Sequence, residues 1–441
     1  MSYTPKYQTT WTKEYQKSNW TQPVYPVIAD LQFSAGLSIG DTVKRRYRSN
    51  PIFTNDLSAD GSYSVQNYTE AEESFTISKQ KEASVQIPKP AILHTDIDTQ
   101  KSYGKQLSNA LYNQIDADVL NIARAGAGYT ISDGDFGGTA NNGITASISN
   151  IADIPLIAIE KFRGASVVYD LNKKFGKLAY EEYDGMLTWI VPPQIMTIID
   201  KYLMARGTAL GDQVVVNGYK GIFGNFNLFI NNNLPFTTRL ALSVNPTDGD
   251  TITIKGVTIT FKTTVDAGTT AGQVKIASTA ALTVTNLVAF LNAPTTTVAD
   301  ATNAGYNGFG AANTVSEGGY TILKSRAIQG LSATDGTTYV DILMKGTGKV
   351  TVSSSFTSAS NLFTSALQIV HSLFIIGKNV SLAVRQDPEI YENPVSGKVA
   401  RDYVMWTVYD GNVFRDQARA IIDLLINVSA TSFATFTNVK A

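Results

Sequence analysis

Hydrophobic and polar positions alternate in the N-terminal quarter of the chain, and this alternation predicts a long β-hairpin over residues 41–90. Its first strand begins at Thr42 and its turn-forming residues occupy Asn55–Gly61. The returning strand places apolar residues at alternate positions, namely Phe75, Ile77, Val85 and Ile87. This is too little apolar surface for a separate core, so we expect the hairpin to lie on another surface. The pattern favours an assembly protein.

The two arms of this hairpin carry opposite charge. The basic residues of the first arm are Lys44, Arg45, Arg46 and Arg48, and the acidic residues of the second are Glu70, Glu72 and Glu73. Pairs formed within the hairpin would each contribute a few tenths of a kcal/mol. The same charges facing an adjacent subunit would set register and orientation. Both interpretations remain open, and the seven residues are candidate inter-subunit contacts.

Residues 1–40 are predicted to form an extended N-terminal arm. The arm carries Trp11 and Trp20 among polar residues, and Pro23 and Pro26 disfavour a helix. Exposed aromatic side chains on such an arm need a covering surface. That surface is either the domain to which the arm belongs or a neighbouring subunit, so Trp11 and Trp20 are further candidate contacts.

The periodicity changes from two to between three and four residues after Asp98, which predicts one long amphipathic helix ending at Ala125. One apolar face is formed by Tyr103, Leu107, Leu111, Ile115, Val119, Ile122 and Ala123. Asp98 and Thr99 are capping residues, and Gly126 ends the run. At 1.5 Å per residue the helix would be about 40 Å long.

Further along, the pattern predicts alternating short helices and strands. Helices are expected over 151–162, 194–204 and 362–374, and strands over 187–191, 226–230, 380–385, 403–409 and 418–428, with Gly411 at the turn of a final hairpin. Residues 236–360 are dense in Thr, Ser, Ala and Gly, and this shift predicts a small inserted β-rich domain. Within it we expect a hairpin turning at Lys255-Gly256 and a helix over 280–292.

Composition narrows the function. The 441 residues carry a net charge of −1, which gives no general attraction to nucleic acid or to acidic membranes. The absence of cysteine excludes disulfides and thiolate chemistry, and two histidines offer little material for a metal site. The N-terminal sequence has no apolar core typical of a signal peptide, and no apolar run reaches membrane-spanning length.

No catalytic constellation is recognisable, so we predict that the protein is not an enzyme and needs no cofactor or metal. The glycines at 218, 221 and 224 have the wrong spacing for a nucleotide-binding loop. Asp133 and Asp135 lack the ligand spacing of a calcium loop. His371 is expected on an apolar helix face as a structural histidine.

The order of these elements resembles the major capsid (coat) proteins of tailed double-stranded DNA bacteriophages. The resemblance rests on the segments FTISKQKEASVQIP, DIDTQKSYGKQLSNALYNQIDADVLNIA, WIVPPQIMTIIDKYL, GIFGNFNLFINNNLP and YVMWTVYDGNVFRDQARAIIDLLI. It implies an α+β fold of the Hong Kong 97 type, with an N-arm, an E-loop hairpin, a long spine helix, axial and peripheral domains, and here an inserted β-rich domain.

The resemblance also implies a domain map. Residues 1–40 would be the N-arm, 41–90 the E-loop, 91–150 the peripheral domain with the spine helix, 151–235 the first part of the axial domain, 236–360 the insertion, and 361–441 the C-terminal axial and peripheral part. Because the arm starts at Met1, any scaffolding protein is expected to be a separate chain.

The function implied is self-assembly, through hexamers and pentamers, into an icosahedral shell that encloses double-stranded DNA without reading its sequence. Expected partners are a portal, a scaffolding protein and decoration proteins, with assembly in the host cytoplasm, location in the virion and no membrane. Two alternatives stay open. An encapsulin-like shell would enclose cargo enzymes, and a surface adhesin would explain the Thr-rich block.

Overall fold

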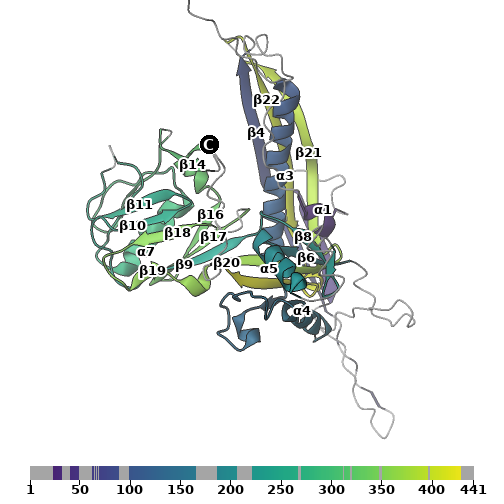
Figure 1. Cartoon of the computed structure of the whole chain (residues 1–441). Coiled ribbons are helices and arrows are strands. Elements are labelled where there is room, and N and C mark those ends of the chain that lie inside the picture. Colours follow the sequence, from purple (N-terminus) through teal and green to yellow (C-terminus); the bar gives the residue numbers. More distant parts are fainter. Residues whose placement is uncertain are drawn as a thin grey trace, which may run out of the picture. The chain divides into compact units, whose positions relative to one another are not determined.

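The structure is a computed structural model that describes residues 23–31, 40–48, 62–63, 65, 67, 69–88, 99–164, 186–205, 221–266, 270–310, 312–317, 320–346, 350–395 and 398–428 (Figure 1). The chain divides into two compact units. Unit 1 comprises residues 1–23, 29–115 and 380–414, and unit 2 comprises residues 24–28, 116–379 and 415–441. The long helix α3 (Thr99–Ala125) runs through both and confirms the helix predicted from the periodicity.

Unit 1 is built on a four-stranded sheet in the order β1-β21-β22-β4. The bounds of these strands are Ala29–Asp30 (β1), Val380–Pro394 (β21), Ala400–Asn412 (β22) and Lys79–Pro88 (β4). The first half of α3 lies along this sheet (Figure 1) and packs Leu107 and Leu111 against Ile87, Tyr403 and Met405. Alternation along β4 and β22 therefore gives the sheet its helix-covered face.

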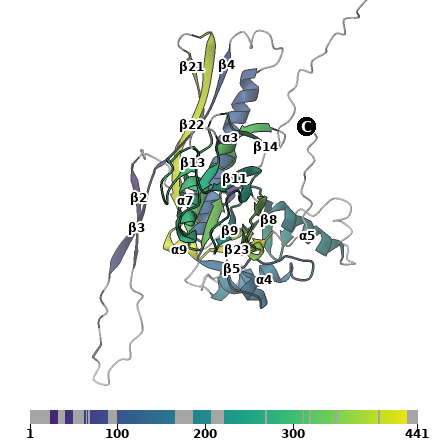
Figure 2. The ribbon, with the colours of Figure 1, turned by 90° about the vertical axis from the view of Figure 1, so that its left-hand side faces the viewer.

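A second, two-stranded sheet in unit 1 joins β2 (Thr42–Arg48) to β3 (Glu70–Thr76) in antiparallel register. Figure 2 shows these strands as a narrow pair. The predicted hairpin is thus divided: its basic and acidic arms pair with each other, whereas β4, expected to continue the hairpin, pairs with β22.

Unit 2 contains a mixed sheet of ten strands among the described residues, with a main path β16-β17-β9-β20-β6-β8-β7. The bounds along that path are Leu331–Asp335, Tyr339–Met344, Phe236–Leu242, Ile369–Ile376, Leu187–Val191, Phe226–Ile230 and Ile222–Phe223. The remaining strands are β19 (Asn361–Phe363), which pairs with β9, β23 (Ile421–Asn427), which pairs with β20, and β5 (Tyr129–Ile131), which pairs with β23. β20, β6 and β23 are predominantly apolar and fully buried, as central strands should be.

Three of these strands, β9, β16 and β17, come from the block predicted as an insertion, so that block contributes to the main sheet of unit 2. Other parts of it form a five-stranded sheet, β13-β12-β11-β10-β18, with the helix α7 (Ala280–Asn292). The strands of this smaller sheet are Tyr306–Asn307, Gln273–Lys275, Val257–Lys262, Thr251–Ile254 and Val352–Ser355. The boundaries 236–360 for an inserted domain stay a prediction.

Short elements complete both units. They are α1 (Tyr25–Ile28), η1 (Asp133–Phe136), α4 (Asp153–Gly164), α5 (Pro193–Met204), β14 (Thr314–Glu317), β15 (Tyr320–Leu323), α8 (Lys324–Ala327), η2 (Ser365–Leu367) and α9 (Arg415–Ala418). The helices predicted at 151–162 and 194–204 correspond to α4 and α5. Pro193 lies at the start of α5, where the missing N–H costs no helical hydrogen bond.

The helix predicted over residues 362–374 is wrong, because the chain there forms β19, the short turn η2 and the buried strand β20. A continuous apolar run has no period that separates a buried strand from a buried helix. Gly411 was also misplaced at a turn: it lies inside β22, opposite Leu382 of β21.

The hairpin predicted at Lys255-Gly256 is confirmed and supplies a test of the turn. Both residues have positive φ, 52° and 75°, a conformation that glycine adopts without the steric cost of a Cβ. We expect Gly256→Ala to lower the free energy of unfolding by about 1 kcal/mol. Gly164→Ala is the matched control, because a Cβ at Gly164 would meet nothing within 4 Å. Equal stability of both variants in urea titrations would contradict this account.

Candidate functional site: a charged two-stranded ribbon

The β2–β3 ribbon brings most of the candidate contact residues together. Arg45 lies opposite Glu73 and Arg46 opposite Glu72 in the strand register. The Lys44 Nζ lies 3.3 Å from Glu72 Oε2, and the Arg46 guanidinium lies 3.4 Å from Glu72 Oε1 and 3.9 Å from Glu70 Oε2. Of the two interpretations left open by the sequence, the isolated chain thus shows pairing across the ribbon.

These ion pairs are largely solvated. The side chains of Lys44 and Arg46 are 63% and 74% exposed, and those of Glu72 and Glu70 are 43% and 46% exposed. Exposed pairs of this kind contribute about 0–1 kcal/mol. The charges therefore add little to the stability of the chain, and a charged surface of this ribbon stays accessible to a partner.

The strand pleat separates the predicted basic cluster onto two faces. Lys44 and Arg46 are exposed on one face, whereas Arg45 is half-buried on the other, with its guanidinium 5.5 Å from the centroid of the Phe414 ring. Consecutive side chains of a strand alternate in this way, so Lys44, Arg45 and Arg46 cannot form one patch. Only the exposed face is a candidate for contact with a neighbour.

The base of the ribbon is fixed to the β21–β22 sheet by an apolar cluster. Its buried members are Val43, Phe75, Ile77, Ala383, Val408 and Phe414, with Trp406 packed against them. The Phe75 and Phe414 ring centroids are 6.0 Å apart. Close to this cluster, the Ser78 hydroxyl donates to Asp410 Oδ2 at 2.8 Å, and Lys79 Nζ lies 3.3 Å from Asp410 Oδ1. The ribbon is thus packed against the sheet at its base, and its charged face is exposed to solvent.

Trp11 and Trp20 lie outside the described residues, as does the side chain of Arg48. Their candidate role in contacts between subunits therefore stays a prediction.

Sequence reasoning missed a buried polar centre in unit 2. The carboxylate of Asp116 on α3 is fully buried and accepts four hydrogen bonds. Its Oδ1 accepts from the backbone N–H groups of Val24 and Tyr25 at 2.7 and 2.8 Å, and its Oδ2 accepts from the amides of Asn231 and Asn233 at 2.7 and 2.9 Å. Val24 and Tyr25, which belong to the predicted N-terminal arm, are thereby fixed to α3. The Asn-rich run at 231–233 was the available signal.

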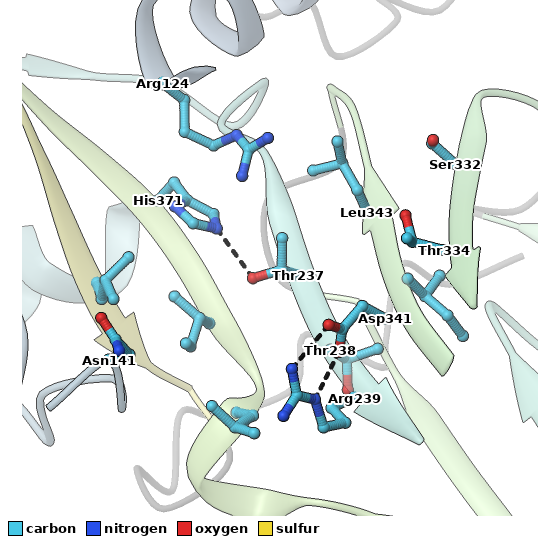
Figure 3. Close-up of a pocket in the computed structure, with 14 residues that line it drawn as sticks. Arg124, Asn141, Thr237, Thr238, Arg239, Ser332, Thr334, Asp341, Leu343 and His371 are labelled. Carbon is cyan, nitrogen blue, oxygen red and sulfur yellow. Dashed lines mark hydrogen bonds and ion pairs between the residues drawn. The ribbon is translucent and has the colours of Figure 1, made fainter. Parts of the chain in front are cut away.

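A pocket of about 360 Å³ lies in unit 2 between β9, β17 and β20 (Figure 3). Arg239 forms a two-point pair with Asp341, with nitrogen–oxygen distances of 2.6 and 2.7 Å, and this hydrogen bonding raises the pKa of Arg239. His371 Nδ1 lies 2.8 Å from Asp423, and His371 Nε2 lies 2.9 Å from the Thr237 hydroxyl. His371 is buried and hydrogen-bonded, on the strand β20 rather than on a helix.

The part of the chain that the structure describes shows no group of three or more acidic or histidine side chains arranged to hold a metal ion. Among the helices described, none has both the length and the apolar character needed to cross a membrane.

Comparison with known proteins gives structural likeness only. No family model matches the sequence, and no curated protein matches it. Among solved structures, one titled "Mycobacterium phage Che8" superposes with a TM-score of 0.53 at 8% identity, covering 96% of this chain and 98% of that one. This likeness shows a shared fold. The α+β class predicted from the sequence is confirmed, and the Hong Kong 97-type arrangement is consistent with it.

Two further structures align over similar lengths with TM-scores below 0.5. "Capsid structure of the Cyanophage P-SCSP1u" has a TM-score of 0.48 at 10% identity and covers 95% of this chain and 92% of its own. "Asymmetric unit of bacteriophage PhiM1 mature capsid" has a TM-score of 0.47 at 8% identity and covers 96% and 92%.

Proposed function

We propose that this chain is the major capsid protein of a tailed bacteriophage and assembles with copies of itself into an icosahedral shell. The observation that carries the proposal is the fold shared with the Mycobacterium phage Che8 structure over nearly the whole of both chains. Such a shell needs a subunit that contacts several neighbours through separate surfaces, because many weak contacts made together give a stable assembly.

The β2–β3 ribbon supports this proposal independently of the comparison. A two-stranded ribbon is at best marginally stable alone in water, and this one packs on the β21–β22 sheet through the apolar cluster at its base. Its exposed ion pairs contribute at most about 1 kcal/mol each to the stability of the chain. We infer that this face lies on the adjacent subunit, where charge of both signs selects register and orientation.

The domain map is proposed on the same basis. The E-loop would span residues 41–90, which include the ribbon and β4. The helix α3 would be the spine helix, and β6, α5 and β8 would be elements of the axial domain. The portal, the scaffolding protein and decoration proteins are proposed partners, the genome is the proposed content, and the host cytoplasm is the proposed site of assembly. An encapsulin-like compartment and an adhesin are less favoured, since the structural neighbours come from phages.

Electron microscopy of the expressed full-length protein tests the proposal. We expect closed shells of uniform diameter, formed by the chain alone or together with a scaffolding protein from the same genome. Small discrete oligomers at every protein and salt concentration, with and without scaffolding protein, would contradict the proposed function.

A further inference from the structure

The pocket in unit 2 has two ends of different character. In Figure 3, the Arg124, His371 and Thr237 side chains gather at one end, and the Arg239–Asp341 pair lies at the other. Between them the lining includes apolar residues, namely Ile342, Leu343, Leu367, Ile369 and Leu425. We call this cavity the Arg124 pocket. Its volume of about 360 Å³ is within the range of small-molecule sites.

Two carboxylates, Asp341 in the pocket lining and Asp423 bonded to the lining residue His371, already have hydrogen-bond partners. Both oxygens of Asp341 accept from Arg239. Both oxygens of Asp423 lie within 3.0 Å of His371 Nδ1. Asp423 attracts Arg124 electrostatically, but its carboxylate oxygens are hydrogen-bonded to His371. Both carboxylates therefore already have hydrogen-bond partners other than Arg124.

Arg124 differs from the other charged residues of the pocket. Its Nε atom is buried and has no hydrogen-bond partner among the described residues. Burial lowers the pKa of the Arg124 guanidinium, against the opposing attraction of Asp423. Leaving a charged donor desolvated and unpaired is costly, and native proteins usually supply such a group with an acceptor. An oxyanion is the acceptor that matches the planar guanidinium.

The size of the pocket limits the ligand further. Its volume exceeds that of a lone phosphate or carboxylate group. A bare ion would therefore leave the apolar lining residues in contact with water. A ligand that joins one oxyanion to a small apolar body would occupy both regions. The Thr237 hydroxyl is hydrogen-bonded to His371 and lies at the same end of the pocket as Arg124. It could therefore contact the charged group of the ligand.

We propose that the Arg124 pocket binds a small organic oxyanion, either a carboxylate or a phosphate monoester, with its charged group on Arg124 and its apolar part against the β17 and β20 side chains. This site is separate from the β2–β3 ribbon and does not depend on the capsid assignment. Occupation would supply an acceptor to the Arg124 Nε, which the described residues leave unsatisfied.

Thermal unfolding of the full-length protein tests this site, with butyrate and phenyl phosphate as the probes and sodium chloride at matched ionic strength as the reference. We expect a saturable rise in Tm with at least one probe, because a ligand that binds only the folded chain stabilises it. A rise with butyrate would indicate recognition of a carboxylate, and a rise with phenyl phosphate would indicate recognition of a phosphate monoester. If neither probe gives a saturable rise in Tm, the proposal is wrong.

Variants separate a binding role from a structural one. In chloride, Arg124→Met should be at least as stable as the native protein, since it removes a partly buried guanidinium whose Nε has no acceptor among the described residues, and it should lose the probe-dependent rise. Arg163→Met, at an exposed position on α4, is the matched control and should keep that rise. A probe-dependent rise that persists in Arg124→Met would overturn the proposal.

Calorimetric titration gives a second measurement, which does not depend on the Arg124→Met variant folding. Arg124→Gln should weaken binding of the active probe by at least about tenfold, the loss expected for one charge-assisted hydrogen-bonded contact. Arg124→Lys should retain part of the affinity, because it keeps the charge but not the planar fork. Unchanged affinity in Arg124→Gln would assign the site to other residues and overturn the proposal.

Discussion

Replacing Asp116 with alanine is expected to lower the free energy of unfolding of unit 2 by about 3–5 kcal/mol, because it leaves buried donors without an acceptor. Two of these donors are the backbone N–H groups of Val24 and Tyr25, and the other two are the side-chain amides of Asn231 and Asn233. Guanidinium chloride titrations measure the loss. Amide hydrogen exchange over residues 23–28 should show faster exchange at the same time.

Two further variants check that the carboxylate itself is responsible. Asp116→Asn should cost less than alanine but remain destabilising, because an amide nitrogen would face the Asn231 and Asn233 donors. Asn231 cannot relieve this clash by rotating its amide, since its Oδ1 accepts the Asn233 N–H at 2.6 Å. Glu160→Ala, at an exposed position on α4, should change stability by no more than about 0.5 kcal/mol. Equal losses at positions 116 and 160 would contradict the account.

Periodicity predicted the amphipathic parts of this fold well. The helix α3 and the hairpin at Lys255-Gly256 were predictable because one face of each is polar, so the residue period is visible in the sequence. The strand β20 was mistaken for a helix because all eight of its residues are buried. A segment with no solvent-facing side carries no period, and only its strand neighbours decide its conformation.

The candidate sites show a similar division. Opposite charges on β2 and β3 were evident from the sequence, but the split of the basic cluster between two faces follows from the strand pleat and from the Phe414 contact. The Asp116 centre and the Arg124 pocket join residues that lie more than 90 positions apart in the sequence. Neither has a local spacing that a single sequence reveals, so both required the tertiary structure.

Reversing the exposed ribbon charges is expected to impair assembly while leaving the chain folded. Lys44→Glu combined with Arg46→Glu removes the exposed pairs with Glu70 and Glu72, whose combined contribution to stability is about 1–2 kcal/mol at most. If the ribbon lies on an adjacent subunit, the same change places like charges at a repeated contact. We expect the yield of shells to fall about tenfold or more, measured by sedimentation and electron microscopy.

A charge exchange distinguishes contact with a neighbour from pairing inside the ribbon. Adding Glu70→Lys and Glu72→Lys to the double variant restores opposite charges across β2 and β3 but inverts the pattern that a neighbour meets. If the charges act between subunits, this fourfold variant should fold normally and still assemble poorly. Lys105→Glu with Lys201→Glu is the control for the double variant: it makes the same change in net charge at exposed helix positions and should assemble normally. Recovery of shells in the fourfold variant would show that the charges act only within the ribbon, and the proposed contact with a neighbour would be wrong.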